Sequence, residues 1–189
     1  MWLDQVKQAR GEEVLEVTWR PFSLEQVNQK VGPDHRVWDL PESEQHPSLW
    51  GLRAGVAAGN QGQDKLRAFL PLLLRARHED RVELSDLDIH KRLAGEAGLD
   101  VARLEQDIRD PASLKAVAAS YDEAREKGVF GTPTFVFPNG ASAFLKMVRP
   151  RTPEDASKAF DTLMALMEGE LFIGEVKRPQ PPWPKGIFD

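Results

Sequence analysis

Three side chains able to bind a metal ion or to move a proton stand close together at Asp86, Asp88 and His90. In a helix, residues four positions apart share one face, so Asp86 and His90 could hold a metal ion between a carboxylate and an imidazole. The alternative is a solvated helix start, where acidic side chains suit the positive end of the helix dipole. We expect the solvated helix start and predict no metal site.

The absence of cysteine limits the chemistry more sharply. Without a thiol, this chain has no disulfide, thiolate nucleophile, persulfide carrier or cysteine-ligated metal. The other histidines show no ligand spacing, and neither a Gly-x-Ser-x-Gly motif nor a dinucleotide fingerprint occurs. Gly55, Gly59 and Gly62 lack the Lys–Ser/Thr pair of a phosphate-binding loop, so we interpret them as helix or loop glycines.

The most informative motif is Gly128-Val129-Phe130-Gly131-Thr132-Pro133-Thr134, in which a proline opens a predicted strand. Proline at this position favours a tight turn, and a cis peptide bond is one way to make such a turn. Only about 5–6% of X-Pro bonds in folded proteins are cis, so these residues alone leave the isomer open.

The first two thirds of the chain are predicted to be mostly helical. Apolar spacing predicts a helix over residues 2–10, and the alternation of residues 14–19 predicts a strand. Residues 23–47 contain turn signals and no clear period. From Ser48 to Lys127 the apolar period is helical throughout, which predicts four or five helices with caps at Ser85, Asp100 and Asp110.

The last third is predicted to begin with a β-hairpin. Residues 134–137 and 143–148 form its strands, joined by a turn at Asn139-Gly140. Thr152 and Pro153 then start a closing helix. The tail from Arg178 is rich in proline, so it is neither helix nor central strand.

The order of helix, Gly-Val-Phe-Gly-Thr-Pro-Thr, strand, Asn-Gly, strand and helix resembles the C-terminal half of the DsbA-like thioredoxin-fold family. This family includes kappa-class glutathione transferases and 2-hydroxychromene-2-carboxylate isomerases. Residues 16–24, Glu-Val-Thr-Trp-Arg-Pro-Phe-Ser-Leu, resemble its second core strand and exit loop. The resemblance implies an α/β, thioredoxin-like fold with an all-helical insertion, in which the first core strand is missing. Residues 1–47 and 128–189 would form the thioredoxin-like domain, and residues 48–127 the insertion.

The resemblance also implies where a ligand would bind. The family's matching proline is cis and faces the active site, which makes Gly131, Thr132 and Pro133 the expected substrate- or thiol-binding residues. Family members carry Cys-x-x-Cys, or a Ser in the isomerases, at the start of the first helix. This chain begins inside that helix, so none of its residues inherits that role and the catalytic residues are unknown. Two explanations stay open: the native protein starts further upstream, or a divergent domain fills the missing position from elsewhere.

Two functions are therefore considered. The first is an oxidoreductase or isomerase relative without a usable dithiol motif in this chain, with glutathione or another low-molecular-weight thiol as cofactor. The second is a non-catalytic module that binds a ligand or peptide in the groove beside Pro133. Arg149 and Arg151, just before the closing helix, are a further candidate site for a carboxylate, with a solvated turn as the alternative.

The net charge of −5 argues against a nucleic-acid partner, since phosphate binding needs clustered Lys and Arg. Neither a basic leader nor an apolar run of about 20 residues occurs, so we expect a cytoplasmic chain that does not enter a membrane. The expected partner is a small-molecule or thiol substrate. A homodimer is also considered, because relatives often dimerise and an exposed sheet edge promotes association.

Overall fold

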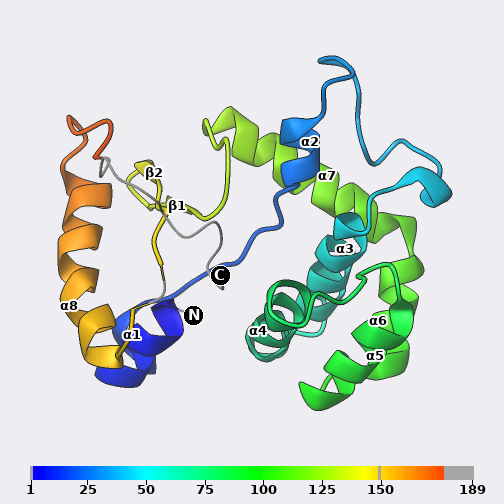
Figure 1. The fold of residues 1–189 in the computed structure, drawn as a ribbon, viewed down its shortest axis with the longest axis horizontal. Coiled ribbons are helices and arrows are strands. Elements are labelled where there is room, and N and C mark those ends of the chain that lie inside the picture. The colour runs from blue at the N-terminus through cyan, green and yellow to red at the C-terminus, as the bar shows by residue number, and fades with distance from the viewer. Residues whose placement is uncertain (1, 149, 177–189) are drawn as a thin grey trace. The chain divides into compact units, whose positions relative to one another are not determined.

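The computed structural model describes residues 2–148 and 150–176. The chain folds into two compact units (Figure 1). Unit 1 combines the two ends of the chain, Met1–Val17 and Thr132–Asp189, and unit 2 is the continuous stretch Thr18–Gly131. These limits differ from the expected limits of the helical insertion, residues 48–127, because compactness and family domain boundaries are different properties. The expected assignment of domains stays a prediction.

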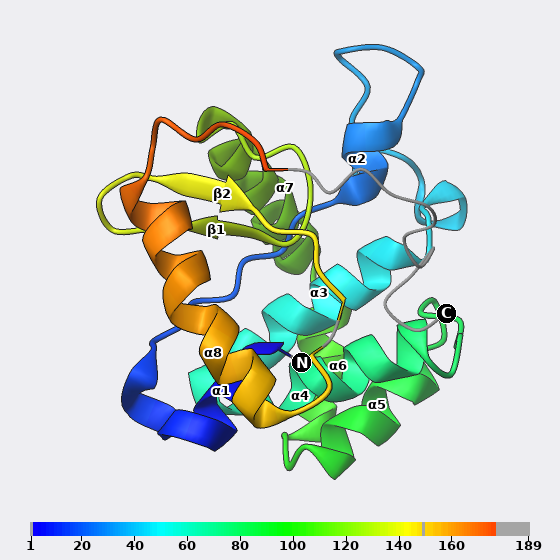
Figure 2. The ribbon, with the colours of Figure 1, turned by 60° about the vertical axis from the view of Figure 1, so that its left-hand side comes forward.

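Unit 1 contains a two-stranded sheet and two longer helices. Its elements are, in chain order, α1 (Trp2–Arg10), the 3₁₀ turn η1 (Glu12–Val14), β1 (Thr134–Val136), β2 (Ser142–Phe144), α8 (Pro153–Met164) and the π-helical turn η3 (Ala165–Gly169). Figure 2 shows β1 and β2 as adjacent antiparallel arrows with α8 crossing near them.

The predicted hairpin is confirmed, with shorter strands than expected. Thr134 pairs with Phe144 and Val136 with Ser142. The turn is closed by the Gly140 amide, which donates to the Phe137 carbonyl at 3.0 Å. Gly140 has a φ of +86°, a backbone conformation that glycine adopts without steric cost.

Helices α1 and α8 pack against each other, although their sequences lie about 150 residues apart. The buried face of α1 includes Trp2, Leu3 and Val6, as its apolar spacing predicted. The Trp2 ring meets Phe135 of β1 edge-on, with ring centroids 6.1 Å apart, and lies 6.1 Å from Phe160 of α8. Trp2 therefore joins α1, the hairpin and α8 into one small core.

Unit 2 is helical throughout its described elements. They are α2 (Leu24–Asn28), the 3₁₀ turn η2 (Glu42–Glu44), α3 (Ser48–Gly59), α4 (Gln63–His78), α5 (Leu87–Glu96), α6 (Val101–Arg109) and α7 (Pro111–Glu126). The expected block of four or five helices is thus confirmed, with five helices between Ser48 and Glu126. Helix α3 packs against α4, α6 and α7, and α5 packs against α4 and α6.

Two apolar clusters stabilise unit 2. The larger one joins the inner faces of α3 to α6, with the fully buried side chains Phe69, Leu104 and Ile108. The smaller one surrounds Tyr121, whose ring stacks on Phe22 at 5.1 Å and meets Trp38 edge-on at 5.3 Å. Both clusters bury large side chains from sequence-distant elements, which is the main source of stability for helices of this length.

Two local predictions were wrong. Residues 15–19 keep the expected alternation of half-buried and exposed side chains, but they do not form a strand. Within the described residues, the sheet consists of β1 and β2 alone, so this segment has no strand beside it with which to form a ladder. The cap of α5 is Asp86, whose carboxylate accepts from the Asp88 amide at 2.9 Å, and not Ser85.

The other predicted caps are confirmed. Asp100 accepts from the Arg103 amide at the start of α6. Asp110 accepts from the Ala112 amide at the start of α7, which has Pro111 in its first turn. Thr152 accepts from the Asp155 amide at the start of α8. The proline-rich tail lies outside the described residues. Among the helices of the described ranges, none combines the length and apolarity that a bilayer crossing requires.

Candidate functional site

The segment that leads into β1 is the expected ligand-binding position. The Thr132–Pro133 peptide bond is cis. Thr132 and Pro133 are both exposed, whereas Gly131 is buried and belongs to the end of unit 2. The structure therefore presents two of the three expected residues to solvent.

The Pro133 carbonyl is held by the hairpin, because it accepts a hydrogen bond of 3.1 Å from the Leu145 amide. Within the described ranges, neither the backbone nor the hydroxyl group of Thr132 takes part in a hydrogen bond. Thr132 is thus an exposed residue next to the strand β1, and its backbone donor and acceptor make no hydrogen bond to another described residue. Such groups can pair with an extended ligand in the manner of an added strand.

A ligand at this position would meet a rigid support. The hairpin rests on Trp2 through Phe135, and the Trp2 indole donates to the Ala156 carbonyl of α8 at 3.2 Å. The Asn139 side chain donates to the Glu168 carbonyl at 3.1 Å, which fastens the turn of the hairpin to η3. The hairpin is therefore fastened at the middle of β1 and at its turn.

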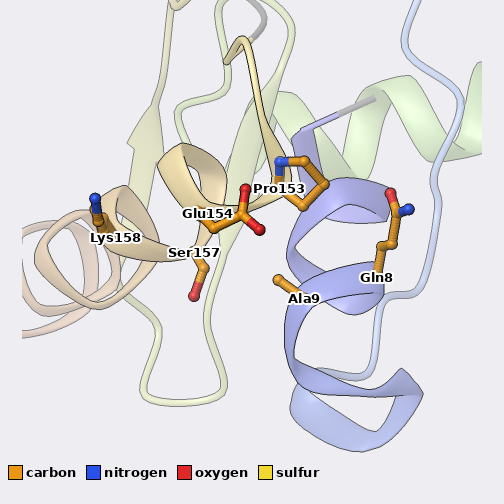
Figure 3. A pocket seen from close by; sticks show the side chains of 6 residues that line it. All are labelled: Gln8, Ala9, Pro153, Glu154, Ser157 and Lys158. Carbon is orange, nitrogen blue, oxygen red and sulfur yellow. The ribbon is translucent and has the colours of Figure 1, made fainter.

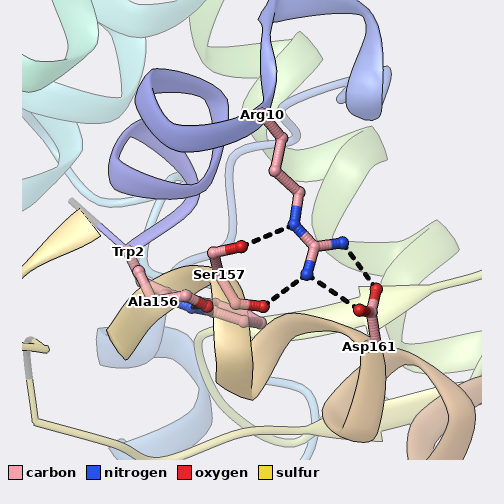
Figure 4. Close-up of polar contacts among 5 residues, drawn as sticks. All are labelled: Trp2, Arg10, Ala156, Ser157 and Asp161. Carbon is pink, nitrogen blue, oxygen red and sulfur yellow. Dashed lines mark hydrogen bonds and ion pairs between the residues drawn. The ribbon is translucent and has the colours of Figure 1, made fainter. Parts of the chain in front are cut away.

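Arg10 fixes α1 on α8 in the same unit (Figure 4). Its guanidinium donates to both carboxylate oxygens of Asp161, at 2.6 and 2.8 Å, and to the hydroxyl and carbonyl oxygens of Ser157. The Arg10 guanidinium lowers the pKa of the Asp161 carboxyl group, mainly through these hydrogen bonds. The geometry is the two-pronged pairing that gives an arginine–carboxylate pair its directionality.

The second expected site, before α8, is described only in part. Arg151 is exposed, and Arg149 lies outside the described residues. Glu154 and Asp155 occupy the first turn of α8, so a carboxylate ligand there would meet two negative charges. The carboxylate groups of glutathione fit this helix end poorly for that reason. The anion site remains a prediction.

An open hollow of about 530 Å³ lies between α1 and α8 (Figure 3). It is lined by Gln8, Ala9, Pro153, Glu154, Ser157 and Lys158. The Ser157 hydroxyl already accepts from Arg10 at 2.7 Å. The two charged residues of the lining, Glu154 and Lys158, have opposite signs. The hollow thus presents neither a single charge nor an apolar wall that would select a ligand.

One cluster of side chains of the types used in catalysis was not predicted from the sequence. The His46 Nδ1 atom lies 2.9 Å from the Ser48 hydroxyl and 3.2 Å from a Glu25 carboxylate oxygen. A catalytic relay uses the two ring nitrogens for different partners, whereas here one nitrogen faces both. That nitrogen also accepts from the Ser48 amide at 3.1 Å, which is a capping contact at the start of α3. The cluster is therefore best explained as a helix cap.

The three residues first considered for a metal ion each have a different partner in the structure. Asp86 caps α5, and Asp88 pairs with Lys91. His90 is fully buried, which the expectation of a solvated helix start did not foresee. Across the described ranges, no three His, Asp or Glu side chains converge in a way that could hold a metal ion.

Two known proteins illustrate what this chain is similar to. The uncharacterized protein Rv2286c of Mycobacterium tuberculosis is 24% identical over 183 residues, which cover 96% of this chain and 76% of that protein. The ClpXP adapter protein SpxH of Shouchella clausii is 33% identical over 104 residues, which cover 55% of this chain and 34% of that protein.

The expected fold class is confirmed by the family match together with the small hairpin and the large helical block. The sequence pattern of the DSBA-like thioredoxin domain matches residues 2–158, which is most of the chain. The chain therefore belongs to the family of DSBA-like thioredoxin domains.

Proposed function

We propose that this chain is a non-catalytic binding module, which holds an extended peptide segment beside Thr132 and Pro133. The observation that carries the proposal is that Thr132 is an exposed residue whose backbone makes no hydrogen bond within the described residues. An extended peptide supplies the alternating donors and acceptors that such a position can pair.

Two further facts favour binding over thiol chemistry. The 189 residues contain no cysteine, so none of them can exchange a disulfide. One relative is named an adapter protein, which is consistent with a binding role for the part of the chain that resembles it. Membership of the family alone supports the other reading, an oxidoreductase or isomerase relative acting with a thiol such as glutathione.

The test is a pair of substitutions at one residue. Thr132→Pro removes the backbone N–H donor that the ligand would use. Thr132→Val removes only the hydroxyl group and keeps this N–H donor. Binding of an unstructured, cysteine-free, fluorescent peptide should weaken about fivefold in T132P, as expected for one backbone hydrogen bond, and remain unchanged in T132V.

Equal loss in both variants would show that the Thr132 side chain, not its backbone, is recognised. If both variants keep the peptide affinity of the wild-type chain, the peptide binds elsewhere and the proposal is refuted. Reduced glutathione serves as the second probe, and if it binds while the peptide does not, the thiol-dependent reading is favoured.

A further inference from the structure

His90 is a titratable group enclosed in the apolar core of unit 2. Its side chain has no solvent exposure. One ring nitrogen, Nε2, lies 2.7 Å from the Leu84 carbonyl oxygen, while the other, Nδ1, is buried and has no hydrogen-bond partner among the described residues. The ring is therefore a neutral imidazole whose Nε2–H group donates to Leu84, because a proton on Nδ1 would be left buried and unpaired.

The contact with His90 holds Leu84, which lies in a connection between two helices. This connection is the segment 79–86, which connects α4 to α5 and carries the exposed charged side chains Glu79, Asp80, Arg81 and Glu83. The Leu84 side chain packs on Gly51 of α3 so closely that a Cβ atom at Gly51 would come within 2.8 Å of it. Leu84 is thus held twice, by its side chain on α3 and by its carbonyl on His90.

Upstream of Leu84, the segment is held on α4 at Glu79, Asp80 and Val82, and the Glu79 and Asp80 amides both donate to the Arg75 carbonyl. The Val82 amide donates to the Ala76 carbonyl at 3.0 Å, and the Val82 carbonyl accepts from Arg77 at 3.3 Å. The Asp86 amide closes a local turn on Glu83. Among the described residues, the bond between Leu84 and His90 is therefore the hydrogen bond that ties the connection to a helix between Val82 and the Asp86 cap of α5.

The surroundings of His90 disfavour a positive charge. The helices packed against α5 present apolar buried faces, with Leu73 and Ala76 on α4 and Leu104 and Ile108 on α6. Asp86 is the charged group that acts on the ring, and Lys91 is occupied by Asp88 and Glu105. Burial lowers the pKa of His90, and the Leu84 carbonyl and Asp86 oppose this only in part.

We propose that His90 is an acid-sensitive latch, which holds the segment 79–86 on the helical unit while the ring is neutral and releases it when the ring takes up a proton. Protonation would put a second, unpaired N–H group into the core. The ring can gain a partner for that group only by reaching water, and this requires the Leu84 contact to open.

The sign of the pH dependence follows from the lowered pKa. The open state, with an ordinary histidine near pH 6.5, binds more protons than the closed state, so acid favours opening. The latch is fully closed above about pH 6.5 and weakens as the pH falls below it. One unit lower, at about pH 5.5, opening should be favoured up to about tenfold more than at neutral pH.

Hydrogen exchange of the whole chain at pH 7.5 and 5.5, corrected for intrinsic rates, tests the latch. We expect about tenfold less protection of residues 79–86 at the lower pH, with little change in α7. The matched variant is His90→Gln, because the glutamine amide can donate to Leu84 but does not titrate. It should remove the acid response, whereas His35→Gln, at a half-buried histidine outside this contact, should keep it.

Unchanged protection of the wild-type segment at the two pH values would overturn the proposal, as would an acid response that persists in H90Q. If H90Q does not fold, nitrogen NMR of the wild-type ring decides. A native ring that stays neutral at pH 5.5 with its proton on Nε2 supports the latch, and one that titrates near pH 6.5 while protection is unchanged contradicts it.

Discussion

At the scale of single residues, the most unusual group is a buried arginine in α3. Arg53 is 3% exposed, stacks over the Trp50 ring at 4.7 Å and donates to the Ser113 hydroxyl at 3.1 Å. Glu42, 3.8 Å away, supplies the nearest opposite charge. A buried cation of this kind is held by its partners together and costs stability when they are lost.

Replacing Arg53 should destabilise unit 2 in proportion to what is removed. Arg53→Ala loses the hydrogen bond, the stacking and the packed stem, and should lower the free energy of unfolding by about 2–4 kcal/mol. Arg53→Met keeps most of the stem and should cost less. The control is Arg92→Met, at an exposed pair with Glu96, where urea unfolding should change by less than about 0.5 kcal/mol. Equal losses of unfolding free energy in the Arg53 and Arg92 variants would contradict the stabilising role of the buried Arg53.

The pair of Arg10 and Asp161 gives a second residue-scale prediction. Because Arg10 lowers the pKa of Asp161 in the folded chain, the pair contributes stability above the ordinary aspartate value of about 4 and loses it as the pH falls through the lowered value. Arg10→Gln should raise the pKa of Asp161 toward about 4, measured by carbon NMR of the carboxyl group. An unchanged titration in R10Q would show that the contact is not populated in solution.

At the scale of elements, the sequence predicted what depends on local signals. The hairpin, the five helices of the block and the caps at Asp100, Asp110 and Thr152 follow from turn chemistry and apolar period. The strand expected at residues 14–19 failed because a strand requires a neighbour, and alternation alone cannot supply one.

The hairpin turn offers a clean test of one such local signal. Gly140 has a φ of +86°, and a Cβ atom there would meet nothing within 4 Å, so the cost of Gly140→Ala is purely conformational. We expect a loss of about 1–2 kcal/mol in the stability of unit 1. Gly169→Ala is the control, since that position is equally open and has no positive φ. Thermal unfolding that is equally affected by both changes would contradict the turn conformation.

At the scale of the whole molecule, the candidate site was predictable only through the family. The motif around Pro133 led to the expected site, which stays a prediction. The structure added that Thr132 is exposed and that its backbone makes no hydrogen bond to another described residue. The cluster of Glu25, His46 and Ser48 and the buried His90 were not foreseen, because both depend on how sequence-distant segments pack.

The central claim is that an extended peptide binds at Thr132 by backbone pairing. The most direct measurement is an amide NMR titration of the full chain with the unstructured, cysteine-free peptide. We predict that the largest shifts lie at Thr132 and in β1, with the helices of unit 2 far from this loop in sequence, such as α5, unchanged. Shifts confined to unit 2, or no saturable shift at Thr132, would contradict the proposed function.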